Sequence, residues 1–430
     1  MANYKAKDEL LCQLSKEDRT ALLSIYQHRC LDTSLLDNYV YRDIGIEPQQ
    51  GSAKTVKLRE LGLIELVEYG QKYPALFLTT LGIEAVKATS GEILRELYQF
   101  DGGKQVLPLA HDLKMNPKII NHQMHLNSFA MELASYAGEQ GYFRYFDEKM
   151  MPPASNFMMP DAMAELDNCY LFLEMDMGTE AKGRLAQKWN SYRTFLNDPA
   201  GFYQKKRVVM LFIIDGVKNV ELRKRNVTAG LMTHIPDRVN GYFEAYVDGV
   251  KALHEIVKAR ILPPIKDIEA SELAICRTIN LQHGFSVSKP AFFQELDVRY
   301  TYYIRSLDEN RKIRVFHGRV QEFILDIWLD GRLSILRSIL FYQRSLGQIR
   351  KKAGRDLAYV IIVPSEKAAC VLLKELNSPQ PEGMYFTTPD RLAQKAWHQA
   401  LFSIDLLWNL SHFTDESLEE TVHEKRLFRF

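Results

Sequence analysis

The chain has 430 residues, of which 46% are hydrophobic and 25% are charged, and its formal net charge at neutral pH is +1. This composition is typical of folded globular proteins, and the length predicts two or three domains because single cores seldom exceed about 250–300 residues. A nearly neutral chain has no global basic field, so any affinity for nucleic acid must come from local patches.

Features of membrane and secreted proteins are missing from the sequence. No run of about 18 apolar residues occurs, and the N-terminal stretch MANYKAKDEL lacks the apolar core of a signal peptide. The five cysteines are scattered without a CxxC pair, which argues against a zinc module or a disulfide framework. We therefore expect a cytoplasmic protein with no membrane contact.

Residues 1–95 are expected to form a first domain. A helix starts at Ser15, a second short helix is capped by Asp32, and a third covers 52–61. Two strand-like segments follow, at 63–68 and 75–80, with a polar turn between them. Three helices followed by a hairpin are typical of a winged helix-turn-helix.

In such a module the third helix enters the major groove of double-stranded DNA and the turn between the strands forms the wing. The candidate DNA-binding residues are Lys54, Thr55, Lys57 and Arg59 on the helix and Lys72 on the wing. The alternative is a protein-contact module in which these residues only solvate a helix face.

A linker, 96–118, precedes a second predicted domain, 119–265. It opens on a long helix that begins near Ile119. This helix carries His122 and His125, which we expect to be ordinary residues of a helix face, and Glu132, a candidate acid.

Acidic residues bracket a predicted hairpin in this domain. Pro160 and Asp161 precede one strand, and the apolar run 169–173 leads directly into Glu174 on the next. The hairpin would set Asp161 and Glu174 side by side, an arrangement suited to a divalent cation such as Mg²⁺ or Mn²⁺. Asp176 leaves the same strand face as Glu174 and is a candidate third ligand.

A helix, 181–197, and a buried strand, 207–214, complete an order of helix, three strands, helix and strand. This order resembles the PD-(D/E)XK nuclease superfamily, with Asp176 standing where its lysine is expected. The resemblance implies catalytic roles for Asp161 and Glu174 and makes Lys188, on the following helix, the candidate basic residue.

The same pattern returns later in the chain, which predicts an internal duplication. Asp326 lies 152 residues after Glu174, and Pro389 lies 153 residues after Pro236. We expect a degenerate second nuclease-like domain at 270–410, followed by a tail, 411–430. Counting back from Asp326 puts the place of Asp161 at 311–314, where basic residues stand.

The winged helix, His125 with Asn127, the segment Pro160-Asp161-Ala162, and the sequences FLEMDMGTE and KWNSYRTF resemble the replication-relaxation proteins of Gram-positive plasmids and mobile elements. The likeness covers roughly residues 15–260. It implies a role in plasmid replication, DNA relaxation or conjugative mobilisation, with a relaxase or other plasmid-transfer or replication proteins as partners.

The sequence thus predicts an α/β (α+β) protein with a winged helix-turn-helix and two tandem PD-(D/E)XK nuclease-like domains, the second degenerate. Three functions remain open: a DNA-binding accessory protein, a metal-dependent endonuclease or nickase, and a transcriptional regulator or protein-interaction platform. The absence of the expected lysine, whose place is taken by Asp176, favours the DNA-binding accessory protein. The presence of Asp161 and Glu174 favours the endonuclease or nickase. A homodimer is compatible with each.

Overall fold

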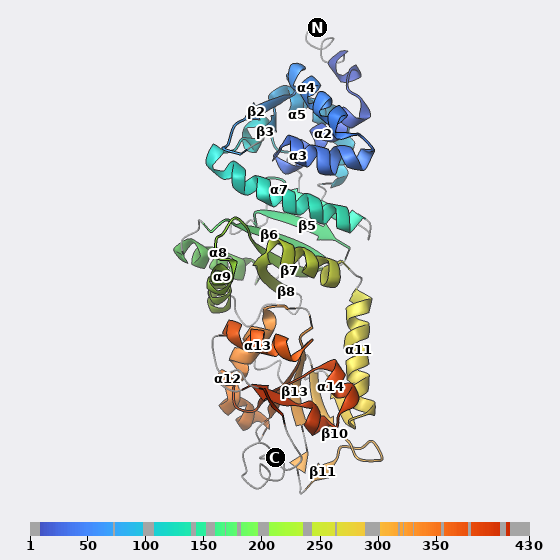
Figure 1. Cartoon of the computed structure of the whole chain (residues 1–430), viewed down its shortest axis with the longest axis vertical. Helices are drawn as coiled ribbons and strands as arrows, with labels where there is room; N and C mark the ends of the chain where they lie inside the picture. Colours follow the sequence, from blue (N-terminus) through green and yellow to red (C-terminus); the bar gives the residue numbers. More distant parts are fainter. Residues whose placement is uncertain are drawn as a thin grey trace. The chain divides into compact units, whose positions relative to one another are not determined.

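The computed structural model is a mixed α/β protein, as the sequence predicts (Figure 1). It describes residues 9–71, 74–97, 107–138, 143–151, 160–167, 169–178, 182–196, 206–234, 243–262, 265–288, 302–316, 319–320, 322–329, 331–353, 357–376, 380–404 and 410–412. One compact unit comprises Met1–Gly230 with Tyr246–Leu262, and the other comprises Leu231–Ala245 with Pro263–Phe430. None of the helices in these described ranges is both long and apolar enough to cross a membrane.

The N-terminal module contains the predicted helices and hairpin. Its elements are α2 (Lys16–His28), β1 (Cys30–Leu31), α3 (Thr33–Leu35) with a π-helix (Leu36–Tyr41) and a 3-10 turn (Arg42–Ile44), α4 (Pro48–Glu60), β2 (Ile64–Val67), β3 (Ala75–Leu78) and α5 (Thr80–Leu97). Ser15 caps α2 through its hydroxyl, which accepts a hydrogen bond from the Asp18 amide at 3.2 Å. The three strands form an antiparallel sheet in the order β1-β3-β2.

The first αβ core follows this module. It comprises α6 (Ala110–Leu113), α7 (Pro117–Gly138), β4 (Phe143–Asp147), β5 (Ala162–Leu166), β6 (Cys169–Asp176), α8 (Lys182–Leu196), β7 (Arg207–Ile214), α9 (Val220–His234), β8 (Phe243–Gly249), α10 (Val250–Ile256) and a π-helix (Val257–Ile261). The sheet order is β4-β5-β6-β7-β8. The first two pairings are antiparallel, and β6 runs parallel to β7.

Alternation along β6 decides which side chains reach each helix layer, because successive residues of a strand point to opposite faces. Leu171, Leu173 and Met175 belong to the hydrophobic cluster that includes the apolar face of α7. Phe172, on the other face, packs near Tyr192 of α8. Glu174 therefore emerges on the α8 side of the sheet.

The second core repeats this plan. It comprises α11 (Ile265–Leu281), β9 (Phe285–Ser288), β10 (Tyr302–Ser306), β11 (Val315–Phe316), β12 (Arg319–Val320), β13 (Glu322–Ile327), α12 (Ser334–Ala353), β14 (Ala358–Ile362), α13 (Glu366–Leu376), β15 (Met384–Thr387), α14 (Pro389–Gln394), α15 (Trp397–Ala400), β16 (Phe402–Ile404) and β17 (Leu410–His412). Strands β9, β10 and β13 are antiparallel neighbours, and β13 runs parallel to β14. Strand order and pairing sense thus match those of β4 to β7.

Strand register corrects the predicted location of the missing acid in the second core. In the first core Ala162 pairs with Leu173, so Asp161 precedes β5 opposite Glu174. In the second core Tyr302 pairs with Leu325, one residue before Asp326. The counterpart of Asp161 is therefore Thr301, which lies outside the described residues, and not 311–314. The two-carboxylate arrangement is still lost, because threonine is not an acid.

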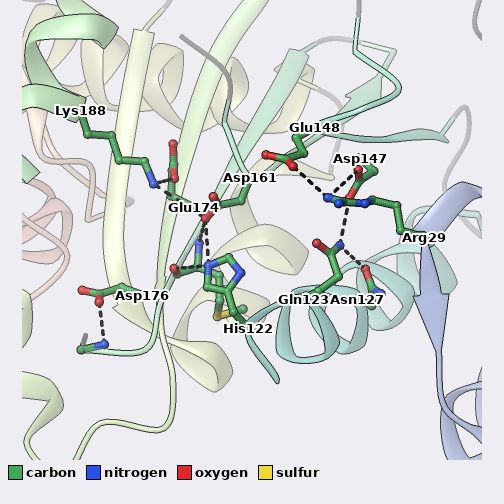
Figure 2. A network of polar contacts seen from close by, with 12 residues as sticks. Arg29, His122, Gln123, Asn127, Asp147, Glu148, Asp161, Glu174, Asp176 and Lys188 are labelled. Carbon is green, nitrogen blue, oxygen red and sulfur yellow. Dashed lines mark hydrogen bonds and ion pairs between the residues drawn. The ribbon is translucent and has the colours of Figure 1, made fainter. Parts of the chain in front are cut away.

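Helix α7 joins the N-terminal module to the first core through buried polar side chains (Figure 2). The Asn127 amide donates to the backbone carbonyls of His28 and Cys30, at 3.0 and 2.6 Å. Gln123 donates to Asn127 at 2.9 Å and to Asp147 at 3.0 Å. Arg29 extends from the module to Asp147, 3.5 Å away. The predicted domains 1–95 and 119–265 therefore share buried contacts within one compact unit.

We expect Asn127→Ala to loosen this junction, because two buried carbonyls of the module lose their donor. Leaving buried acceptors unsatisfied costs roughly 1–3 kcal/mol. Hydrogen exchange of the full chain should show faster exchange of the β1 and β3 amides. Asn38→Ala is the control, because within the described residues the exposed Asn38 side chain hydrogen-bonds only the Ser34 hydroxyl. Equal exchange in both variants would contradict the expectation.

Candidate functional site

The three predicted catalytic residues converge at one end of the first sheet (Figure 2). Asp161 directly precedes β5, Glu174 lies near the end of β6, and Lys188 points from α8 toward both. The Lys188 ammonium forms an ion pair with Glu174 and lies 3.8 Å from Asp161 Oδ2. The side chain of Glu174 is fully buried, whereas that of Asp161 keeps 22% of its exposure.

His122 is a member of this cluster that the sequence did not reveal. Its Nε2 donates to the Met175 carbonyl at 2.9 Å and lies 3.4 Å from Asp161 Oδ2. The Met175 amide donates to the same Asp161 oxygen at 2.8 Å. His122 lies on a face of helix α7, as expected, and its ring also contacts Asp161 beside β6, which the sequence did not indicate.

His125, one turn further along α7, also has a carboxylate partner. Its Nδ1 lies 2.5 Å from Asp215 Oδ2, just beyond the end of β7. Glu132, the acid that we expected α7 to contribute, is bonded elsewhere. Its carboxylate accepts a hydrogen bond from Tyr136 and lies 3.3 Å from His254. The spacing of His122 and His125 was the signal for their shared face, but their partners are distant in sequence.

The pKa values of the two carboxyl groups are shifted in opposite directions. Burial raises the pKa of Glu174 to about 8, although Lys188 opposes the shift. Burial also raises the pKa of Asp161, but Lys188 and His122 outweigh it and bring that pKa to about 2. Tyr192 donates a hydrogen bond to Glu174 from α8. Neutral pH therefore finds Asp161 ionised beside a Glu174 that readily holds a proton.

Asp176, the predicted third metal ligand, is engaged elsewhere. Arg223 of α9 approaches it with two nitrogens, at 2.5 and 3.0 Å, and the Gly178 amide donates to it at 2.7 Å. Within the described part of the chain, no group of three or more His, Cys, Asp or Glu side chains could hold a metal ion. The three-carboxylate ligand set is therefore not assembled, because a guanidinium takes the oxygens of Asp176.

Two carboxylates remain, and their arrangement suits a divalent cation. The Lys188 ammonium is itself a cation placed between Asp161 and Glu174. Mg²⁺ is often bound through only one or two protein carboxylates and keeps several waters. The pair could hold Mg²⁺ or Mn²⁺ with water completing the coordination, and no third acid is required.

The candidate DNA-binding residues of α4 differ in their burial and in their partners. Lys57 lies 2.6 Å from the buried Asp18 carboxylate of α2, and Lys54 lies 3.4 Å from Glu17. Thr55 is buried and donates to the Gly51 carbonyl at 3.2 Å. These three therefore support the packing of α4. Arg59 is exposed. Lys72 lies outside the described residues, as do Thr179 and Glu180.

The sequence model of a family described as replication-relaxation matches residues 22–210. Over these residues the chain is similar to the replication-relaxation family. The matched region begins in α2 and ends in β7, so it contains Asp161, Glu174 and Lys188. A search of curated proteins and a search of solved structures found no significant match.

We expect Glu174→Gln to gain stability relative to the wild type as pH rises from about 4.5 to about 8. A carboxyl whose pKa is raised by folding holds more protons in the folded state, so stability falls with pH across that window. Glutamine does not titrate and removes this loss, which is on the order of a few kcal/mol at most. Melting temperatures across the window measure it. Exposed Glu92→Gln is the control, and a difference independent of pH would contradict the assignment.

Proposed function

We propose that this protein, which is similar to the replication-relaxation family over residues 22–210, binds DNA and nicks it in the replication, relaxation or conjugative mobilisation of a plasmid or mobile element. The convergence of Asp161, Glu174 and Lys188 at one end of the first sheet carries the proposal. The element order α7-β4-β5-β6-α8-β7 is the order expected of a PD-(D/E)XK core, which supports the same chemistry.

Each residue of the cluster has a chemical task in this proposal. Asp161 and Glu174 would hold Mg²⁺ or Mn²⁺, which when bound polarises a phosphate and lowers the pKa of an attacking water. Lys188 places a positive charge where charge develops on the phosphate. His122 orients Asp161 through the contacts described above. Asp176 does not take the role of the missing lysine, because its charge is negative and paired with Arg223.

DNA recognition is assigned to the outward face of α4, with the N-terminal module acting as a winged helix. Arg59 is exposed there, and 43% of Val56 is exposed beside it. An arginine pairs well with a guanine edge in the major groove, and an apolar side chain suits a thymine methyl group. This replaces the lysine-based contacts that the sequence predicted.

A non-cleaving accessory protein or regulator is the second candidate. Engagement of Asp176 by Arg223 and the absence of a lysine two residues after Glu174 favour it. In that case both cores would serve as a platform for a relaxase or other transfer or replication proteins. A cytoplasmic location and a homodimer stay predictions from the sequence.

Incubation with supercoiled DNA and Mn²⁺ tests the enzyme. We expect nicking by the wild type and a loss of at least about 100-fold in Asp161→Ala and Lys188→Ala, because each removes an electrostatic contribution to the transition state. Asp176→Asn is the matched control, because it removes a neighbouring carboxylate that is paired with Arg223. Wild-type protein that binds a specific site but does not nick would favour the accessory role.

Substitution of Arg59 tests the DNA-reading face separately. Arg59→Ala should reduce affinity for the specific site by roughly 1–3 kcal/mol, with little effect on melting temperature. Lys57→Ala should instead lower the melting temperature, because it leaves the buried Asp18 without its nearest cation. Fluorescence anisotropy and thermal unfolding measure the two effects. If Arg59→Ala binds the specific site with unchanged affinity, α4 does not take part in DNA recognition.

A further inference from the structure

The second core carries an insertion that its counterpart lacks. Only two residues, Asp167 and Asn168, separate β5 from β6. Between the equivalent strands β10 and β13 it runs from Leu307 to Gln321 and forms the paired strands β11 and β12. Because the flanking strands pair in the same sense, the extra residues are a local addition. We call residues 307–320 the basic hairpin.

The basic hairpin opens on a turn that precedes β11; residues 308–314, which we call the tip, are fixed there by their own backbone. The Asp308 amide donates to the Lys312 carbonyl at 2.8 Å, and the Asp308 side chain accepts from the Lys312 amide at 2.9 Å. The Arg314 amide donates to the Ser306 carbonyl at 2.9 Å. Arg311 adopts a positive φ of 58° at the turn. A defined backbone therefore presents the side chains of this tip.

Positive charge is concentrated on that tip. Residues 309–314 are all exposed, and they include Arg311, Lys312 and Arg314 but only one acid, Glu309. No carboxylate in the described part of the chain forms an ion pair with these three basic side chains; Arg311 instead bonds the Asn280 side chain. By contrast, Lys54 and Lys57 of the N-terminal module are paired with acids. The unpaired charge stands out in a chain of net charge +1.

We propose that the basic hairpin binds the phosphate backbone of duplex DNA without reading its sequence. The inference rests on the proposed DNA-binding function and gives the second core a role in it. Arginine presents several N–H donors in a planar fork that suits phosphate oxygens, and two of the three cations are arginines. A core with threonine in place of Asp161 has lost the paired acids, so DNA attachment is a function that it can still perform.

Salt-dependent binding of the full chain to a duplex of unrelated sequence tests the proposal. Each phosphate contact contributes about 0.9 to the slope of log affinity against log salt concentration. The variant Arg311→Ala/Lys312→Ala/Arg314→Ala should therefore reduce the magnitude of the slope by about 2–3. We expect its affinity at low salt to fall by roughly tenfold or more. Anisotropy titrations between 50 and 200 mM salt measure both quantities.

Two variants control for general charge and for folding. Lys367→Ala/Lys374→Ala removes exposed charges from α13 of the same unit and should leave the slope within about one contact of the wild type. Arg311→Lys/Arg314→Lys keeps the charge and should retain most of the slope. Melting temperatures verify that each variant is folded.

The outcomes separate this inference from the proposed function. If the wild type binds DNA and the alanine variant has an unchanged slope, the proposed role of the basic hairpin is wrong but the proposed function is not affected. Equal losses in the α13 control would also overturn the proposed role of the basic hairpin, because the effect would then be one of net charge. Absence of any wild-type DNA binding would overturn the proposed function as well.

Discussion

The ion pair between Lys188 and the fully buried Glu174 is the constraint on which the candidate site depends. A buried carboxylate costs several kcal/mol unless a cation or a proton compensates it. The raised pKa of Glu174 shows that Lys188 compensates only in part, whereas Asp161 is held ionised. Such a separation of two neighbouring carboxyl groups is common where acids do chemistry and brings no benefit to folding alone. This difference between the two pKa values supports the chemistry proposed for the cluster.

Helix α7 contacts both this cluster and the N-terminal module. His122 holds Asp161 against β6 on one side, and Asn127, five residues later, holds the backbone of β1 on the other. Both contacts are made by side chains of one helix, so the module and the candidate site are both positioned by α7. Such a link suits the proposed function, in which the module recognises DNA and the cluster acts on it.

Sequence reasoning found what short-range patterns encode. Capping at Ser15, the apolar run before Glu174 and the repeat of strands predicted the elements and the approach of Asp161, Glu174 and Lys188. It did not find His122, because its partner Met175 O is a backbone atom more than fifty residues away. It also assigned Lys57 and Thr55 to the outer face of α4, since a basic residue on a helix does not reveal whether a buried acid such as Asp18 lies opposite. Tertiary pairing decided these positions.

Comparison of the two cores shows how one fold can keep or lose a site by few changes. Glu174 and Asp326 occupy equivalent strands, and each accepts a hydrogen bond from a tyrosine, Tyr192 or Tyr359. The difference lies beside them, where Asp161 in one core corresponds to Thr301 in the other. Asp326 has no second acid beside it, so the second core lacks a pair of carboxyl groups whose pKa values are shifted apart. Asp326 retains a packing and hydrogen-bonding role. Freed from the geometry of a two-carboxylate site, the second core could accept an insertion beside its central strand at little cost to stability, since surface connections tolerate added length.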